Sequence, residues 1–261
     1  MKIIVCIKEV PNTAEVRINP ETNTLIREGV ESVINPFDMY ALEEGIRLKE
    51  RYGGYVSVLS MGPAQVEKSL REAISMGIDE AFLLCAKEFA GADTLSTAYT
   101  LAQGIKKIGD YEIIICGKQA ADGDTAQVGP ELSVCLGIPQ ITYVSKIEEI
   151  NLKEKRIRVR RMTEEGYEVI QTSLPCLITV VKEINEPRLP SLKGKMRAKK
   201  SEIKVYTNED IKADRNRIGL KGSPTQVVKI FSPSQRKAGE ILQGEKEEIV
   251  NRLAEILKKI G

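Results

Sequence analysis

Residues 112–130 read EIIICGKQAADGDTAQVGP, and this stretch decides the fold. It opens with an isoleucine run, Glu112–Cys116, typical of a strand that is buried on both faces of a parallel sheet. A glycine-bearing loop follows, and Pro130 is tolerated only in the first turn of a helix. The next helix is therefore expected to begin between Thr125 and Gly129. Strand, loop and helix in this order are typical of one unit of a doubly wound α/β domain.

Other segments up to residue 181 repeat this pattern of apolar runs and helical spacing. Further apolar runs rich in Ile, Val and Leu occupy Ile3–Ile7, Tyr55–Ser60, Ala81–Cys85 and Cys176–Val181. Helical spacing of apolar residues separates them over Asp38–Arg51, Pro63–Met76 and Asp93–Ile108. The alternation predicts an α/β fold with a doubly wound, mostly parallel, Rossmann-like sheet whose loops gather at the carboxyl ends of the strands.

The pattern changes after Thr142. Charged and apolar residues alternate over Tyr143–Ile150, Lys155–Met162 and Glu168–Thr172, which predicts an antiparallel extension with one wet face. A basic loop over residues 186–200 closes the nucleotide-binding domain, taken as residues 1–200. Residues 201–261 are expected to form an extended C-terminal arm. The arm ends in an amphipathic helix with an apolar stripe at Ile249, Leu253, Ile256 and Leu257.

Composition excludes several classes of function. The 261 residues are 42% hydrophobic, which is enough for a sizeable core, and 39 Lys and Arg balance 37 Asp and Glu. That balance argues against nucleic-acid binding, which needs a basic excess. The chain has no histidine, so a Ser-His-Asp or Cys-His pair and a His-ligated metal site are excluded. We expect no catalytic side chain and no metal site, with any chemistry supplied by a cofactor or a partner.

Two further features concern the cellular compartment. The five cysteines have no C-x-x-C spacing, and we interpret them as small buried side chains in a reducing compartment. The N-terminal apolar run, Ile3–Ile7, is too short for the core of a signal peptide or for a membrane span. We expect a cytoplasmic protein that does not bind a membrane.

The loop after Cys116 has the residues of a phosphate site. A helix N-terminus beside glycines offers free N–H groups to a phosphate, and Thr125 adds a hydroxyl. The loop is neither G-x-G-x-x-G nor a Walker A motif, and a plain turn with Asp124 as N-cap explains it as well. Both interpretations stay open.

Two other loops should reach the same sheet edge. In residues 32–38, Asp38 is a candidate N-cap, and Phe37 either stacks on a planar ring or packs into the core. In residues 60–63, a glycine allows close backbone approach at a strand end. Their convergence with the strand end at Cys6 favours a nucleotide site. An ATP-hydrolysing or adenylating enzyme is not favoured, because no catalytic loop is present.

The order of several short motifs makes the chain recognisable. They are Val5–Lys8, Asn35–Phe37, Met61–Gln65, Ala73–Gly77, Gly117–Ala120 and Asn185–Arg188. In this order, and over essentially the whole chain, they resemble the beta subunit of electron transfer flavoprotein. The resemblance implies a heterodimer with an alpha subunit that carries a flavin, an adenine nucleotide bound by this chain, and electron exchange with an acyl-CoA-type dehydrogenase. The cofactor contacts that it implies are Cys6, Asn35, Pro36, Phe37, Asp38, Met61, Gly117, Lys118, Gln119, Ala120, Ala121, Asp122, Gly123, Asp124, Thr125, Ala126, Gln127 and Val128.

The segment Asp122–Pro130 departs from the mitochondrial-type pattern, which has a run of acids and a Cys-Asn there. It resembles the electron-bifurcating branch, in which the beta subunit holds FAD in place of AMP. That FAD takes electrons from NADH and sends them singly along two routes, with ferredoxin or flavodoxin as a low-potential acceptor. Gly123 would remove a side chain where a larger ligand passes. The alternative is a subunit that binds AMP structurally and leaves all redox chemistry to the alpha-subunit FAD.

The resemblance also implies two contact surfaces. In the family, residues like 186–200 form a recognition loop that inserts one leucine into the dehydrogenase. That leucine falls on Leu192, with Arg188, Lys193 and Lys195 as a charged rim. The ordinary alternative is a solvated lysine-rich loop. The C-terminal arm is expected to pack on the alpha subunit, or else back on its own domain.

Overall fold

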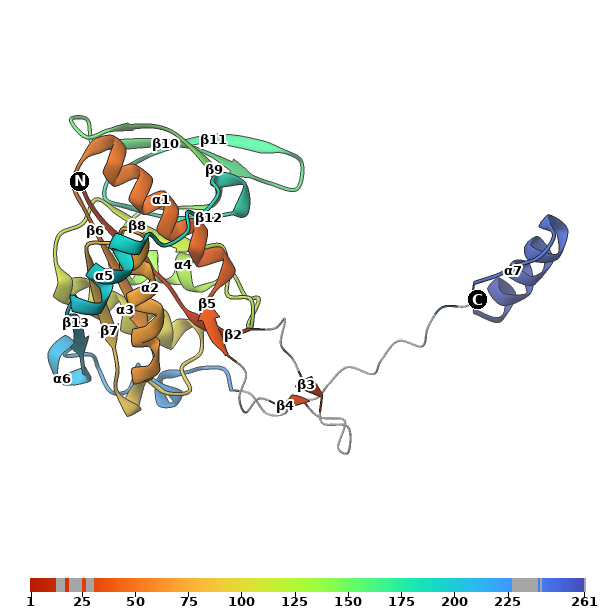
Figure 1. The fold of residues 1–261 in the computed structure, drawn as a ribbon, viewed down its shortest axis with the longest axis horizontal. Coiled ribbons are helices and arrows are strands. Elements are labelled where there is room, and N and C mark those ends of the chain that lie inside the picture. Colours follow the sequence, from red (N-terminus) through yellow and green to blue (C-terminus); the bar gives the residue numbers. More distant parts are fainter. Residues whose placement is uncertain (13–16, 19–24, 27–30, 227–238, 240, 261) are drawn as a thin grey trace. The chain divides into compact units, whose positions relative to one another are not determined.

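The computed structural model describes residues 1–12, 17–18, 25–26, 31–226, 239 and 241–260. The chain divides into two compact units, Met1–Val227 and Val228–Gly261. In the first unit, helices cover both faces of one sheet (Figure 1). No helix in the described ranges is long and apolar enough to cross a membrane.

A nine-stranded sheet forms the centre of the first unit, in the order β11-β10-β9-β12-β8-β1-β6-β7-β13. Its inner strands are β1 (Lys2–Cys6), β6 (Tyr55–Met61), β7 (Glu80–Leu84), β8 (Ile113–Gly117) and β12 (Cys176–Val180). Along the part of the sheet with the order β9-β12-β8-β1-β6-β7-β13, each strand pairs in parallel with its neighbour. These inner strands are mainly buried, which explains their continuous apolar runs. The predicted fold class is confirmed.

Helices cover the sheet on two sides. The first core cluster joins α1 (Pro36–Tyr52) and α2 (Glu67–Met76) to the sheet through residues such as Leu42 and Ile74. The second joins α3 (Thr94–Ile108) and α4 (Val128–Leu136) to the opposite face through Ile105 and Leu132. A 3-10 turn, η2 (Ala64–Val66), precedes α2, where the sequence predicted a continuous helix from Pro63.

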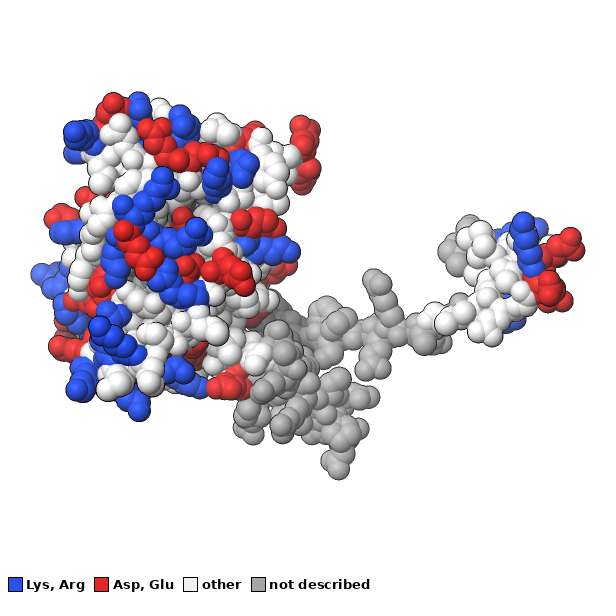
Figure 2. Space-filling model, turned by 45° about the horizontal axis from the view of Figure 1, so that its top comes forward, with Lys and Arg blue, Asp and Glu red and all other residues white. Residues whose placement is uncertain are grey.

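The antiparallel strands extend the same sheet. They are β9 (Gln140–Asn151), β10 (Arg156–Met162) and β11 (Tyr167–Ser173), and β9 pairs in parallel with β12. Two small sheets lie outside, β2 (Glu9–Pro11) with β5 (Ser32–Ile34), and β3 (Arg17–Ile18) with β4 (Leu25–Ile26). Neither small sheet was predicted. Over the visible face of this unit, Lys and Arg are intermingled with Asp and Glu (Figure 2).

The expected loop at residues 186–200 is partly helical. Helix α5 (Leu192–Lys200) has Ser191 as its N-cap, and the Ser191 hydroxyl accepts the Gly194 N–H at 2.9 Å. The Arg197 guanidinium donates to the carbonyls of Ile74 and Ile78 at 2.6 and 2.7 Å, at the C-terminal end of α2. Cationic groups favour that end of a helix. The contact with α2 stabilises a segment that its sequence presents as a lysine-rich loop.

The expected start of the arm at residue 201 differs from the structure. Strand β13 (Ile203–Tyr206) pairs in parallel with β7, and α6 (Asn208–Ile211) and η5 (Leu220–Gly222) follow it within the first unit. Ile211 and Ile218 are buried in the core cluster that contains α3. The boundary therefore lies after Val227, because apolar side chains up to that region belong to the main core.

The second unit contains helix α7 (Lys246–Ile260). It carries the predicted apolar stripe, of which Leu253 is 46% and Leu257 is 60% exposed. An apolar stripe with this much exposure is typical of a helix that packs on another surface.

Candidate functional site

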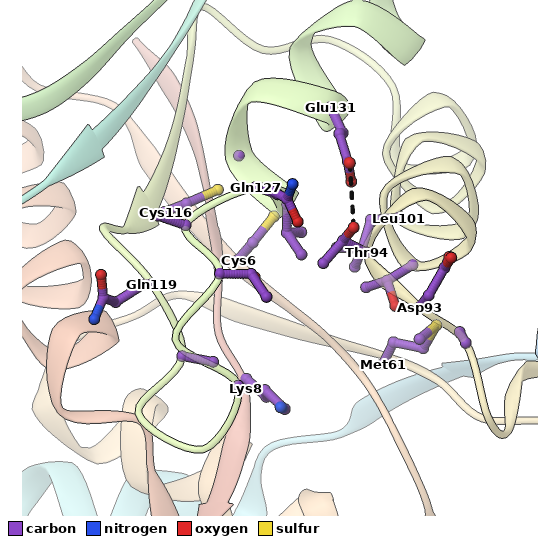
Figure 3. A pocket seen from close by; sticks show the side chains of 18 of the residues that line it. Cys6, Lys8, Met61, Asp93, Thr94, Leu101, Cys116, Gln119, Gln127 and Glu131 are labelled. Atoms are coloured by element: carbon purple, nitrogen blue, oxygen red, sulfur yellow. Dashed lines mark hydrogen bonds between the residues drawn. The ribbon is translucent and has the colours of Figure 1, made fainter. Parts of the chain in front are cut away.

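A cavity of about 830 Å³ opens at the carboxyl edge of the sheet (Figure 3). The chain runs from β1 outward to β6 and β7 and then returns to β8 on the other side of β1. This reversal is the switch point at which open α/β sheets bind ligands. Cys6 at the end of β1 and Cys116 in β8 pair in register and both line the cavity.

Most of the predicted cofactor residues line this cavity. They are Cys6, Asn35, Asp38, Met61, Gly117, Lys118, Gln119, Ala120, Gly123, Thr125, Ala126, Gln127 and Val128. The remaining predicted residues, Pro36, Phe37, Ala121, Asp122 and Asp124, are not part of its wall. Pro36 is the first residue of α1, and the contacts of the other four residues with the protein are described below.

Gly117 lies close against the backbone of residues 37 and 38 beside the cavity. A Cβ on Gly117 would lie 2.7 Å from the Phe37 carbonyl carbon and 2.8 Å from the Asp38 nitrogen, so only glycine fits. The Asp38 carboxylate is buried and accepts the Lys8 N–H at 2.7 Å. Burial raises the pKa of Asp38 to about 7, against the opposing hydrogen bonds from Lys8, Asn35 and Gly117. Asp38 was a candidate N-cap, but the N-cap position of α1 is occupied by Asn35.

Asn35 holds the loop that follows β8. Its amide Nδ2 donates to the Gln119 carbonyl at 2.8 Å, and its Oδ1 accepts the Ala121 N–H at 3.0 Å. Asn35 is 1% exposed, so its side chain is fixed in place. A second tie comes from the Lys8 ammonium, which contacts the Asp122 carboxylate at 2.6 Å. Ala121 and Asp122 therefore shape the loop and do not line the cavity.

The N-terminus of α4 is left without a side-chain cap. Its N-cap residue is Gln127, which makes no side-chain cap hydrogen bond, and no other side chain of the described residues is bonded to the first N–H groups of the helix. The Asp124 carboxylate, which the sequence offered as a cap, accepts instead from the Gln119 amide. Asp124 and Ala126 have φ values of 52° and 55°, in the left-handed region where non-glycine residues are uncommon. The helix terminus can thus offer its N–H groups to an anion.

Phe37 lies beside the cavity and is only partly buried, so it does not pack fully into the core. Its ring is half-buried outside the cavity wall, with the Lys118 ammonium 5.8 Å from the ring centroid. The same ammonium lies 5.2 Å from the centroid of Tyr143. Within the described ranges, Lys118 has no carboxylate at ion-pair distance. The two rings hold a positive charge at the edge of the cavity, where an anionic ligand can use it.

The floor of the cavity has two thiols. A hydrogen bond with Cys6, together with burial, raises the pKa of Cys116 well above its usual value. The Cys116 thiol is therefore neutral, and both buried cysteines present small apolar side chains to a ligand.

Sequence reasoning missed the opposite wall. It comes from the segment after β7, the first turns of α3 and α4, and the end of the first unit, and it includes Phe89, Gly91, Ala92, Asp93, Thr94, Leu95, Thr97, Leu101, Glu131, Pro224 and Thr225. Asp93 accepts the Ser96 N–H at 3.0 Å and the Thr225 N–H at 3.0 Å, and so joins α3 to residue 225. These bonds outweigh burial and hold the pKa of Asp93 below its usual value. The signal in the sequence was Asp93, which appeared only as the start of the helical pattern over Asp93–Ile108 and not as part of a site.

The predicted docking residues divide into two kinds. Leu192 is 78% exposed, and Lys193 and Lys195 are exposed beside it. Arg188 instead donates to the Glu43 carboxylate at 2.8 Å and to the Glu50 carboxylate at 2.6 Å. Arg188 is therefore engaged within the chain and anchors the segment on α1.

Comparison with known proteins identifies the family. Residues 22–211 match the electron transfer flavoprotein domain. The chain is also 53% identical over 258 residues to "Electron transfer flavoprotein subunit beta" of Thermoanaerobacterium thermosaccharolyticum, covering 98% of each chain. The chain belongs to the family of electron transfer flavoprotein beta subunits. The resemblance seen in the sequence is confirmed.

The chain is also similar to two other proteins from different bacteria. The subunit beta of Clostridium acetobutylicum is 50% identical over 242 residues, covering 93% of this chain and 92% of that one. "Caffeyl-CoA reductase-Etf complex subunit CarD" of Acetobacterium woodii is 48% identical over 245 residues, covering 94% and 92%.

The residues of the cavity are compatible with the adenine nucleotide that the resemblance implies. Its α4 end has free N–H groups and the Lys118 charge, which suit phosphates. Next to α3, the cavity is lined by the carboxylate of Glu131, a residue of α4. Its Oε2 is buried without a hydrogen-bond partner in the described chain. An unpartnered buried acceptor fits a ligand that brings a hydrogen-bond donor.

Proposed function

We propose that this chain binds FAD in the cavity between β1 and β8, as the beta subunit of a heterodimer with an electron transfer flavoprotein alpha subunit. The reach of the cavity is the observation that carries the proposal. Its walls extend from the Gly117–Val128 loop to the first turn of α3 and to Thr225. Its volume lies in the upper part of the roughly 300–1,000 Å³ typical of cofactor sites. This reach favours a dinucleotide over AMP.

Each part of the cavity has a role in holding the cofactor. The α4 N-terminus, Thr125 and Lys118 would bind the pyrophosphate, while Cys6 and Met61 give the adenine apolar surface. FAD bound here would supply the redox chemistry, exchanging electrons with NADH and with the alpha-subunit flavin. The chain itself binds and orients the cofactor and excludes water.

The partners follow from the family and from the exposed surfaces. We propose that α7 packs on the alpha subunit and that Leu192 docks on a dehydrogenase that acts on a CoA thioester. The name of the Acetobacterium woodii relative, which includes a caffeyl-CoA reductase, supports this class of partner. All five cysteines are free thiols, which supports a cytoplasmic location.

A cofactor count tests the proposal. The purified heterodimer, denatured to release its cofactors, should yield about two flavins if this chain holds FAD. One flavin with one AMP would refute FAD binding here and support the structural-nucleotide alternative. A count of two with no reduction by NADH would retain FAD but refute the role of NADH as donor.

A further inference from the structure

Among the described residues that line the cavity, Glu131 has a buried side-chain oxygen without a hydrogen-bond partner. It projects from the first turn of α4 toward α3 (Figure 3). Its Oε1 accepts the Thr94 hydroxyl at 3.1 Å, and its Oε2 has no hydrogen-bond partner in the described chain. A buried carboxylate oxygen without a donor destabilises the folded state, so its presence asks for a function.

The fold does not need Glu131 for capping. The N-terminus of α3 is already capped by Asp93, which accepts the Ser96 N–H. The helix that carries Glu131 is fixed by its neighbour Leu132, which is completely buried in the core. Burial raises the pKa of Glu131, and the negative charge of Asp93 adds to this effect against the bond from Thr94. These properties are those of an acceptor whose missing hydrogen-bond donor comes from a bound ligand.

The charges of the cavity give a bound ligand a direction. Lys118 and the free N–H groups of α4 lie on the side of the Gly117–Val128 loop and suit phosphates. The Glu131 carboxyl group projects from α4 toward Thr94 of α3 and lines the cavity together with Asp93, so the part of the cavity next to α3 disfavours an anion. A dinucleotide with its phosphates at the loop would therefore place a neutral, hydroxyl-bearing portion at Glu131.

We propose that Glu131 is a specificity-determining residue, whose free oxygen accepts a hydrogen bond from a hydroxyl of the ligand's polyol chain beyond the phosphates. The inference rests on the proposed function, because AMP has no such portion. Glu131 then selects a dinucleotide over a mononucleotide. It rejects ligands that carry a further phosphate at that position.

The test compares two ligands in the heterodimer after removal of the nucleotide from this chain. The probes are FAD and ADP, titrated by calorimetry into the unaltered complex and into Glu131→Leu. Because a hydrogen bond to a charged group is lost, FAD should bind roughly 10-fold or more weakly to the variant, while ADP affinity stays within about two-fold. Val134→Ala, on the exposed side of the same helix, is the matched control and should change neither affinity.

Thermal unfolding of the ligand-free complex separates contact from structure. If Glu131 serves the ligand, Glu131→Leu should be at least as stable as the unaltered protein, since it removes a buried carboxylate oxygen that has no donor. A lower unfolding temperature with equal loss of both affinities would assign Glu131 a structural role and overturn the inference. Unchanged FAD affinity would also overturn it. Failure of the unaltered complex to bind FAD would overturn the proposed function, and the inference with it.

Discussion

The Asp38 carboxyl should make the stability of the chain depend on pH. Its pKa of about 7 in the folded protein compares with 3.8 for an ordinary Asp, because it is buried between Lys8 and Gly117. Between these two values the folded chain holds a proton that the unfolded chain has released. The free energy of unfolding therefore falls as pH rises through this window.

The size of the effect follows from the two pKa values. A difference from 3.8 to about 7, at about 1.4 kcal/mol for each factor of ten in proton affinity, corresponds to ~4 kcal/mol. Asp38→Asn is permanently neutral and lacks this contribution. The stability of the variant relative to the unaltered chain should therefore rise by ~4 kcal/mol between pH 4 and pH 8.

Denaturant unfolding of both proteins without nucleotide, followed by circular dichroism at several pH values, measures this difference. Glu44 and Glu131 also have raised pKa values, but they are present in both proteins and cancel in the comparison. A constant offset between the two curves is expected from the change of hydrogen-bonding groups. Parallel curves over the whole range would show that Asp38 is ionised in the folded state and would refute the reasoning.

Three more predictions concern the loop and the two contact surfaces. Gly123→Asp places a carboxylate where a Cβ meets nothing within 4 Å, so the fold should be unaffected while the flavin bound by this chain is weakened or lost. Unchanged flavin content in that variant would remove the loop from the site. Leu192→Ala should weaken docking on the dehydrogenase roughly ten-fold, with flavin content and NADH reduction unchanged. If electron transfer survives that change but not the removal of Lys193 and Lys195, docking is electrostatic. Protease should cleave within α7 in the free chain and spare it in the heterodimer, because the exposed Leu253 and Leu257 would be covered; equal cleavage in both would contradict packing on the alpha subunit.

The inner strands could be predicted because they are buried on both faces. Such strands appear as unbroken apolar runs, as in residues 112–116, and no tertiary information is needed to recognise them. Strand β13 is different, because Ile203 and Val205 alternate with lysine and glutamate at the sheet edge. Helix α5 was missed because its stability depends on hydrogen bonds from Arg197 to the carbonyls of Ile74 and Ile78. These residues lie at and just after the end of α2, more than a hundred residues away in the sequence.

One wall of the candidate site could be predicted from the sequence, because its residues are consecutive in the chain. The loop after β8 is a continuous segment, so its glycines and Thr125 could be read together. The opposite wall combines Thr94, Glu131 and Thr225, which only the fold brings together. Asp122 and Asp124 have the residue types of a ligand site, yet their partners are Lys8 and Gln119. Residue type alone does not distinguish a charge that binds a ligand from one that shapes a loop.

The way Asn35 holds the loop has a consequence for how such proteins diversify. Its bonds go to main-chain atoms of Gln119 and Ala121, so they do not depend on which side chains the loop carries. Substitutions at Gly123, Thr125 or Gln127 can then alter what is bound without altering the path of the backbone. Ligand preference and foldability are separately adjustable in this architecture. The Asn35 contacts would be kept when the side chains on the surface of the loop change.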